Sequence, residues 1–318
     1  MKIGVVGLGN IGKHLASNLL RAGFDVSVHD LDRTAAEPLI ALGALWANSP
    51  AAVAATTDSV ITCLPSVAAI TTVVAGDRGL IEGFGPGSTW IDMSTNERHE
   101  LLRLAELLAA RGVHTLEAPV TGGAHNASSA TITVLVGGDD ATFARHRSVF
   151  EAVGGRVFFL GELGQAAVIK VITNMLAFIH IAATAEAYML AARAGIDLRL
   201  AWEVIRASSG NSFIHETEST TILSGSYDIG FSLDLSCKDL GFATQLGREL
   251  DVPLDIAGLV EQLNIRARAA YGGSAGSPMV ARLLETACGV DLRAPGFPAT
   301  LDEYLATMPR AERVHDQP

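Results

Sequence analysis

The chain has 318 residues, of which 49% are hydrophobic and 18% charged, a composition typical of a globular protein and unlike that of a disordered one. The net charge of −11 and the lack of a basic stripe argue against nucleic acid as a partner, because phosphate backbones are bound by clustered Lys and Arg. The three cysteines lie far apart and form no C-x-x-C pair, so we expect no metal site and no disulfide framework.

These features favour a cytoplasmic protein. The apolar start of the chain reads as strand and turn, not as a signal peptide with a cleavage site. The longest apolar stretch, residues 175–192, contains His180 and Glu186, and we expect it to be too polar to span a bilayer.

The first elements follow a strand, turn and helix pattern. An apolar run over residues 3–6 predicts a buried parallel strand, and Gly7, Gly9 and Gly12 follow it in G-x-G-x-x-G spacing before a helical pattern. A second strand over 24–28 leads to Asp30, about where a ribose-binding acid belongs. Because the glycines stand in this context, we predict that they bind the pyrophosphate of a dinucleotide at a helix start.

Strand and helix patterns then alternate, which is typical of a doubly wound parallel sheet. The expected strands cover residues 60–64, 89–93, 113–116, 131–136 and 156–160, and the expected helices 33–42, 97–111 and 140–153. We therefore predict a Rossmann-type α/β dinucleotide-binding domain over residues 1–163.

After residue 161 the strand patterns end. A helical pattern over 165–194, about 45 Å long at 1.5 Å per residue, predicts a long linking helix. Further helices are expected over 198–207, 238–250, 253–270 and 279–288. We predict an all-helical substrate and dimerisation domain over 164–290 and a tail over 291–318, with a short helix at 301–308. Small substrates usually bind in clefts at domain interfaces, so we expect the substrate there.

Polar residues follow three of the predicted strands, at the sheet edge where ligands of such folds bind. The hydroxyl residues there are Ser66, Ser94, Thr95 and Thr121, and Pro65, Gly122 and Gly123 stand beside them. A hydroxyl followed by two glycines suits a carboxylate, but the same glycines would also shape an ordinary loop, and both interpretations remain open.

Lys170 and Asn174 are four residues apart and share one face of the long helix. Most helical lysines are solvated, but the neighbours of Lys170 are apolar, and burial would favour its neutral amine and bring its pKa towards the range useful for acid and base catalysis. Lys238 begins another expected helix beside Asp239, where an ordinary helix-start ion pair is an equally simple explanation.

Five sequence motifs, which follow one another in the order of a known enzyme family, extend over most of the chain. They are GLGNIG from Gly7, DMST from Asp92, APVTGG from Ala118, GQAAVIKVITN from Gly164 and KDL from Lys238. Over residues 1–290 the chain resembles the β-hydroxyacid dehydrogenase family, which includes 3-hydroxyisobutyrate dehydrogenase and tartronate semialdehyde reductase.

The resemblance implies residue roles. It implies Lys170 as the catalytic acid/base, with Asn174 assisting it. It implies cofactor contacts by Gly7, Gly9, Asn10, Ile11, Gly12, Asp30, Leu64, Pro65, Thr95 and Lys238. It implies substrate contacts by Ser94, Thr121, Gly122, Gly123, Phe231 and Asp239.

The sequence departs from the family pattern in places. Ile11 replaces the usual Met, Thr121 the usual Ser, and Asn126 and Ala130 replace frequent glycines. These changes affect the expectation for the substrate and leave the reaction class unchanged.

We therefore predict reversible hydride transfer between NAD and a short 3-hydroxy acid such as 3-hydroxyisobutyrate, in a homodimer or homotetramer. Asp30 favours NAD, while Arg33 is near enough in sequence to bind a 2′-phosphate, so NADP remains open. A non-catalytic nucleotide-binding module and an imine reductase are the alternatives, and Lys170 argues against both.

Overall fold

The computed structural model describes residues 1–301, 303 and 304. Its contacts divide the chain into two compact units, one over Met1–Lys170 and one from Val171 onward, so the division falls within one long helix. Most of the helix predicted over 301–308, and the end of the predicted tail, lie outside the described residues.

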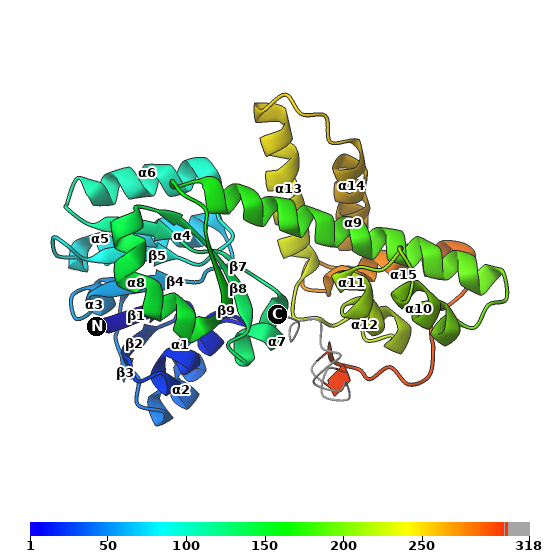
Figure 1. Cartoon of the computed structure of the whole chain (residues 1–318), viewed down its shortest axis with the longest axis horizontal. Helices are drawn as coiled ribbons and strands as arrows, with labels where there is room; N and C mark the ends of the chain where they lie inside the picture. The colour runs from blue at the N-terminus through cyan, green and yellow to red at the C-terminus, as the bar shows by residue number, and fades with distance from the viewer. Residues whose placement is uncertain (302, 305–318) are drawn as a thin grey trace. The chain divides into compact units, whose positions relative to one another are not determined.

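The first unit is built on a mixed sheet of nine strands (Figure 1). Its strands are β1 (Lys2–Val6), β2 (Asp25–His29), β3 (Leu45–Trp46), β4 (Ser59–Thr62), β5 (Thr89–Asp92), β6 (His114–Glu117), β7 (Val120–Thr121), β8 (Ile132–Gly138) and β9 (Gly154–Phe159). The order is β3-β2-β1-β4-β5-β6-β8-β7, with β9 beside β8. From β3 to β6 all neighbours are parallel, which confirms the Rossmann-type prediction. The pairs β6·β8 and β7·β8 are antiparallel, which the sequence pattern did not predict.

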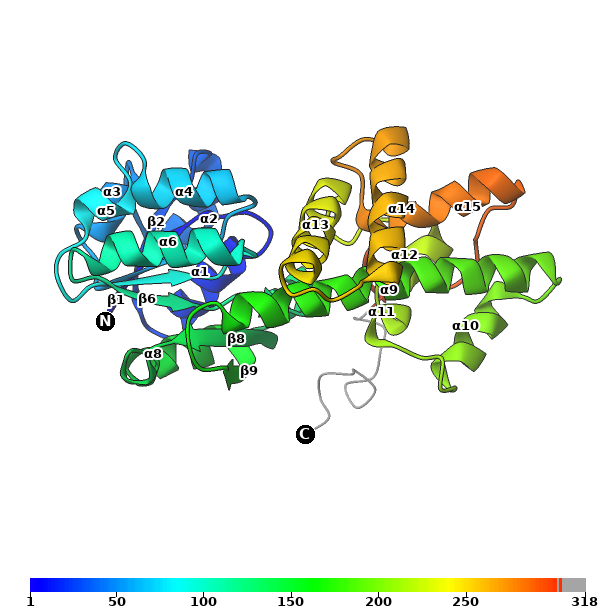
Figure 2. The ribbon, with the colours of Figure 1, turned by 90° about the horizontal axis from the view of Figure 1, so that it is seen from above.

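Helices cover both faces of this sheet. They are α1 (Gly12–Arg21), α2 (Glu37–Ala41), α3 (Pro50–Ala54), α4 (Val67–Ala75), α5 (Leu80–Gly83), α6 (Arg98–Ala109), α7 (Gly123–Ser128) and α8 (Asp140–Val153). Helices α3 to α6 lie on one side of the sheet and α8 on the other (Figure 2). Val5 belongs to the apolar core on the side of α8, and Val6 to the core on the side of α3 to α6. This alternation is expected of a strand that is buried on both faces.

The second unit is helical. It contains most of α9 (Gln165–Arg193), together with α10 (Leu198–Arg206), α11 (Phe213–Glu216), α12 (Ser219–Ser224), α13 (Leu233–Glu249), α14 (Asp255–Tyr271) and α15 (Val280–Cys288). The predicted start of a helix at Lys238 is wrong. Helix α13 begins at Leu233, where the Ser232 hydroxyl accepts a hydrogen bond from the amide of Leu235, so Lys238 lies in the second turn.

Helix α9 is long and apolar enough to cross a membrane by length and composition, a test that core helices of soluble proteins also pass. In its most apolar stretch 44% of the residues are buried. Ile169, Ile172 and Leu176 form an exposed apolar stripe, because their spacing places them on one face of the helix. Lys170 and Asn174 are buried on other parts of the helix circumference.

Candidate cofactor and active site

The glycine turn between β1 and α1 has the geometry of a phosphate cradle. Gly7 has a φ of +94°, and a Cβ on Gly12 would lie 1.9 Å from the carbonyl oxygen of Gly7, so neither position admits a larger residue without strain. A Cβ on Gly9, by contrast, would meet nothing within 4 Å. Gly7 and Gly12 therefore shape the turn and pack the helix, and Gly9 leaves open space beside the backbone, which fits a dinucleotide pyrophosphate.

The start of α1 is also suited to an anion. Ile11 occupies the N-cap position, no side chain caps the helix in the described structure, and its first turn contains no acidic residue. The positive end of the helix dipole therefore favours phosphate groups here, and the amides of Lys13 and His14 donate to the carbonyl oxygens of Gly9 and Ile11 within the turn.

Asp30 lies beside this turn. Its carboxylate accepts hydrogen bonds from the amide of Leu8 at 2.6 Å and from the amide of Asp32 at 2.9 Å. Arg33 lies over the ring of Trp46, with 5.8 Å between the guanidinium carbon and the ring centroid. Asp30 thus joins the end of β2 to the glycine turn, and a carboxylate retains lone pairs for a ribose hydroxyl.

The structure brings two of the predicted residues together at the ends of β4 and β5. The buried Ser94 hydroxyl accepts a hydrogen bond from the amide of Leu64 at 3.0 Å. Asp92, two residues before Ser94, accepts hydrogen bonds from the Thr62 hydroxyl at 3.0 Å and from the side-chain amide of Asn96 at 2.9 Å. Burial raises the pKa of Asp92. This network holds the sheet edge in place, where Thr95 is half-buried and Pro65 is exposed.

The loop after β6 has a fixed backbone. Thr121 of β7 pairs with Thr133 of β8. Gly122 and Gly123 follow Thr121 with φ values of +122° and +83°. The side-chain amide of Asn126 donates a hydrogen bond to the carbonyl oxygen of Gly122 at 2.8 Å. Asn126, noted above as a departure from the family pattern, therefore stabilises the very loop that we expect to bind the carboxylate.

Lys170 ends the first unit and is 7% exposed. Asn174 follows one turn later on α9, where its side-chain amide donates to the Asp239 carboxylate at 2.6 Å. Lys238 Nζ lies 3.3 Å from the other oxygen of Asp239, whose side chain is 1% exposed. Three of the residues predicted from the sequence, Asn174, Lys238 and Asp239, thus form one network in the second unit.

Phe231 is the remaining predicted substrate residue. It lies just before α13, and its ring packs against Phe178 of α9 with centroids 5.7 Å apart. The contact places Phe231 over the same helix that bears Asn174.

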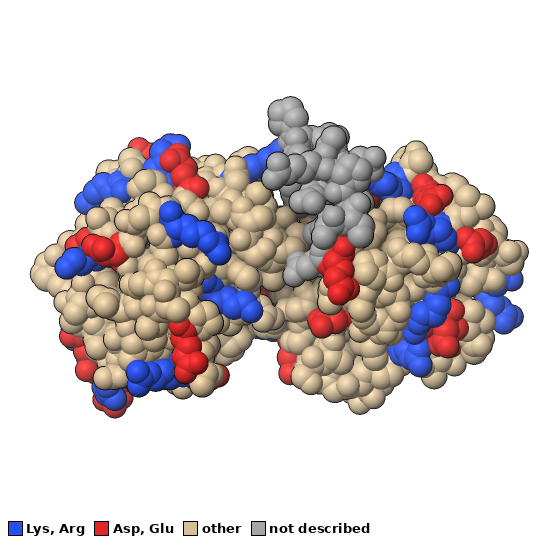
Figure 3. Space-filling view, turned by 90° about the horizontal axis from the view of Figure 1, so that it is seen from below, with Lys and Arg blue, Asp and Glu red and all other residues tan. Residues whose placement is uncertain are grey.

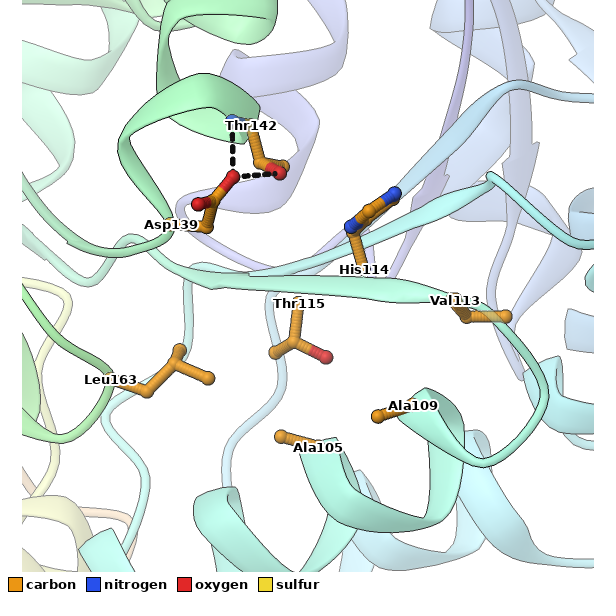
Figure 4. A pocket seen from close by; sticks show the side chains of 8 residues that line it. All are labelled: Ala105, Ala109, Val113, His114, Thr115, Asp139, Thr142 and Leu163. Atoms are coloured by element: carbon orange, nitrogen blue, oxygen red, sulfur yellow. Dashed lines mark hydrogen bonds between the residues drawn. The ribbon is translucent and has the colours of Figure 1, made fainter.

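A separate small pocket lies beside β6, α6 and the start of α8, where the Asp139 carboxylate accepts bonds from the Thr142 amide and hydroxyl (Figure 4). Its lining contains none of the residues that we predicted for the site. We therefore treat this pocket as unrelated to the glycine turn and to Lys170.

One residue of the site was missed. The carboxylate of Glu117, directly before the APVTGG motif, accepts hydrogen bonds from the amides of Gly164, Ala166 and Ala167 at the start of α9. The one sequence feature that could have indicated it is Gly164 at the expected helix start, because glycine has no side chain with which to cap the helix.

Comparison with known families agrees with this geometry. Residues 2–161 match the model of the NAD binding domain of 6-phosphogluconate dehydrogenase, and residues 164–284 match that of the NAD-binding domain of NADP-dependent 3-hydroxyisobutyrate dehydrogenase. The chain belongs to the β-hydroxyacid dehydrogenase family. It is thus an NAD(P)-dependent oxidoreductase of the 3-hydroxyacid dehydrogenase type, as the sequence motifs predicted.

Relatives in the β-hydroxyacid dehydrogenase family span nearly the whole chain. 2-(Hydroxymethyl)glutarate dehydrogenase of Eubacterium barkeri is 32% identical over 293 residues, which are 92% of this chain and 97% of that protein. L-threonate dehydrogenase of Escherichia coli strain K12 is 34% identical over 85% of this chain and 90% of its own. The crystal structure of 3-hydroxyisobutyrate dehydrogenase from Salmonella typhimurium is similar with a TM-score of 0.83 and 32% identity, over 89% of this chain and 99% of that one.

Proposed function

We propose that this chain reversibly oxidises a short 3-hydroxy acid with NAD, and that Lys170 moves the hydroxyl proton. The observation that carries the proposal is the burial of Lys170, which is 7% exposed on the first turns of α9 in a member of a dehydrogenase family. Burial disfavours the charged form of an amine, and a neutral amine can accept a proton.

Residues of the glycine turn, Asp30 and the ends of β4 and β5 would hold the cofactor. They are Gly7, Gly9, Asn10, Ile11, Gly12, Asp30, Leu64, Pro65 and Thr95, with Lys238. The nicotinamide, when bound, supplies the acceptor or donor of hydride. The open space at Gly9 and the uncapped start of α1 support this assignment.

The chain's own residues would orient the substrate and move its proton. We assign the substrate carboxylate to the Thr121 hydroxyl and the amides of Gly122 and Gly123, with Ser94, Phe231 and Asp239 as further contacts. Lys170 Nζ would take the proton from the hydroxyl during oxidation and return it during reduction. Asp239 orients the amide of Asn174 through their 2.6 Å hydrogen bond.

NAD is the proposed cofactor in preference to NADP. The carboxylates of Asp30 and Asp32 both lie at the end of β2, and negative charge there repels a 2′-phosphate. The family model of residues 164–284 is named for an NADP-dependent enzyme, so both cofactors belong in the assay.

The test is a panel of acids assayed with NAD and NADP. It contains 3-hydroxyisobutyrate, 2-(hydroxymethyl)glutarate, L-threonate, glycerate, L-serine and 4-hydroxybutyrate, with 3-hydroxyisobutyramide as a matched control that lacks the carboxylate charge. We expect NAD-dependent turnover of at least one 3-hydroxy acid, and none of the amide, because the carboxylate fixes the reacting carbon. Tight cofactor binding without turnover of any acid would contradict the proposal and favour the non-catalytic module.

We further propose a cytoplasmic homodimer or homotetramer. The exposed stripe of Ile169, Ile172 and Leu176 on α9 supports self-association, and the three cysteines are free thiols. Acidic and basic side chains are interspersed on the described part of the face drawn in Figure 3, without a continuous basic patch, which supports a small-molecule substrate over nucleic acid. Light scattering of the purified protein would measure the assembly.

A further inference from the structure

Glu117 is a buried acid at the end of β6 that the proposed reaction does not use. Its side chain is 1% exposed. One carboxylate oxygen, Oε1, accepts hydrogen bonds from the amides of Gly164 at 2.5 Å and Ala166 at 3.0 Å, and Oε2 accepts one from Ala167 at 2.8 Å. A single side chain therefore binds the first amides of α9 from a position 47 to 50 residues earlier in the chain.

The surrounding backbone is shaped to admit this carboxylate. A Cβ on Gly137 of β8 would lie 2.4 Å from Glu117 Oε1, so a larger residue at Gly137 would displace it. Gly164 has a φ of +94°, and a Cβ there would lie 2.8 Å from Nε of Arg98. Glycine at both positions is thus required for the contact between Glu117 and the start of α9.

The contact matters because α9 has no cap of its own. Gly164 has no side chain to accept these hydrogen bonds, and Ala166 and Ala167 are 0% and 5% exposed, so water does not replace the carboxylate freely. Lys170 lies three residues after Ala167, about 4.5 Å further along the helix axis at 1.5 Å per residue. Glu117 therefore holds the first turn of α9, and Lys170 projects from the turn that follows directly.

Glu117 is also joined to the loop proposed to bind the substrate carboxylate. Thr121 follows it by four residues in the chain, and the segment 117–123 belongs to the same unit as Lys170. One side chain thus links the acid/base helix to the strand that leads into the substrate loop.

We propose that Glu117 is a positioning residue, which fixes Lys170 relative to the Thr121, Gly122 and Gly123 loop by holding the first turn of α9. This inference rests on the proposed function of Lys170. Loss of the contact would let the first turn fray, and the amine would then spend less time in the reactive geometry.

The ionisation of Glu117 sets the pH of the test. Burial, with a smaller contribution from Asp92, its register partner on β5, raises the pKa of Glu117 to about 7 against the opposing effect of the three amides. At pH 8 the carboxylate is ionised and accepts all three bonds, so the experiments belong at that pH.

The first variant is Glu117→Gln, which keeps the shape of the side chain but replaces one oxygen by an amide group that cannot accept a bond. The matched control is Asp139→Asn. Asp139 caps α8 through the Thr142 amide in the same way, is exposed, and holds a helix that bears none of the proposed site residues (Figure 4). Hydrogen exchange at single amides and steady-state kinetics are measured on both full-length proteins.

In Glu117→Gln we expect exchange at Ala166 and Ala167 to become at least tenfold faster. We expect kcat to fall at least tenfold while KM for the cofactor changes less than twofold, because the glycine turn is untouched. In Asp139→Asn, exchange should accelerate at Thr142 and kcat should stay within twofold of the wild type.

Gly137→Ala is the second variant, for the case that Glu117→Gln does not fold. It retains Glu117 but pushes its carboxylate away from α9, and it should reproduce both effects. Unchanged exchange at Ala166 and Ala167, or faster exchange with unchanged kcat, would overturn the positioning role. Absence of turnover in the wild type would instead refute the proposed function, and with it the role of Glu117 in catalysis, while the exchange data would still show whether Glu117 holds the helix.

Discussion

The starts of helices α1 and α9, both in the first unit, differ in whether a side chain caps them. At α1 no side chain caps the helix in the described structure, and the open space at Gly9 adjoins it. At α9 the carboxylate of Glu117 accepts three of the first amide hydrogen bonds. A glycine with a φ of +94° precedes each helix, Gly7 five residues before α1 and Gly164 directly before α9, and only α9 receives a buried acid.

This difference shows how one kind of backbone structure serves two purposes. Uncapped amides at a helix start form a ready site for an anionic ligand, whereas amides bonded to a buried carboxylate fix the helix and bind no ligand. We infer that the uncapped start of α1 binds the cofactor phosphates, and that the start of α9 is capped by Glu117 so that Lys170 is held in place.

The largest effect on activity is expected for substitutions of Lys170 on α9. Lys170→Ala should lower kcat by about 10²–10⁴-fold, the usual contribution of general acid and base catalysis, and leave the Kd for NADH within about twofold. Lys170→Arg is the control, because a guanidinium keeps the charge but does not release its proton, and it should be as inactive. Stopped-flow rates and NADH fluorescence titration measure the two quantities, and an active arginine variant would show that charge alone suffices.

The pH dependence of stability tests the buried acid. Because the folded-state pKa of Glu117 is about 7, against an ordinary value of 4.5, the folded protein keeps a proton that the unfolded chain releases between these values. Stability should therefore fall as pH rises from about 4.5 to 7, by up to about 3 kcal/mol from this group.

Glu117→Gln should lack that part of the slope, since its side chain does not titrate. Urea unfolding of both proteins at pH 5 and pH 8 isolates the contribution, because the buried Asp92 remains in each. Equal slopes in the two proteins would mean that Glu117 ionises in the folded state as it does in the unfolded chain.

The open helix start is tested by two glycine variants. Gly12→Ala places a methyl group 1.9 Å from the carbonyl oxygen of Gly7 and should destabilise the protein by about 1–3 kcal/mol. Gly9→Ala meets nothing in the protein, so its stability should change by less than about 0.5 kcal/mol. Its affinity for NADH should nevertheless fall, because the methyl group occupies the space assigned to the pyrophosphate. Thermal melts and titrations measure both, and unchanged affinity in Gly9→Ala would move the cofactor elsewhere.

The smallest effect concerns the choice of cofactor. Asp30→Ser should raise the ratio of kcat/KM with NADP to that with NAD by about tenfold, because it removes a negative charge near the 2′ position. Asp32→Asn, which changes an exposed acid that caps the next turn, should shift the ratio less. A ratio that does not respond to Asp30 would show that its carboxylate serves only the amides of Leu8 and Asp32.

The sequence was sufficient for elements with a strong pattern. Helix α8 has the predicted bounds, and α9 and α10 differ from theirs by one residue, because long apolar periodicities and caps mark them clearly. Helix α4, by contrast, was not predicted. Its sequence, VAAITTVVA, is rich in β-branched residues, and the Ser66 cap together with packing against the sheet makes it helical.

The site residues that stand in sequence motifs could be predicted, whereas hydrogen bonds between residues far apart in the chain could not. The glycine turn and Lys170 are visible in the sequence, as is the adjacency of Lys238 and Asp239. The hydrogen bonds of Asp30 to Leu8 and of Glu117 to α9 join residues 22 and 47 to 50 positions apart. Such partners depend on tertiary structure, and no local periodicity in the sequence specifies them.

The most direct measurement is chemical rescue of Lys170→Ala by small primary amines such as methylamine. If the Lys170 amine moves the proton, the free-base form of the added amine should restore turnover in proportion to its concentration, and more basic amines should be more effective. Addition of the same amines to the wild type should change little. A Lys170→Ala protein that binds NADH and folds normally, yet whose turnover is already near that of the wild type without any amine, would contradict the role proposed for Lys170.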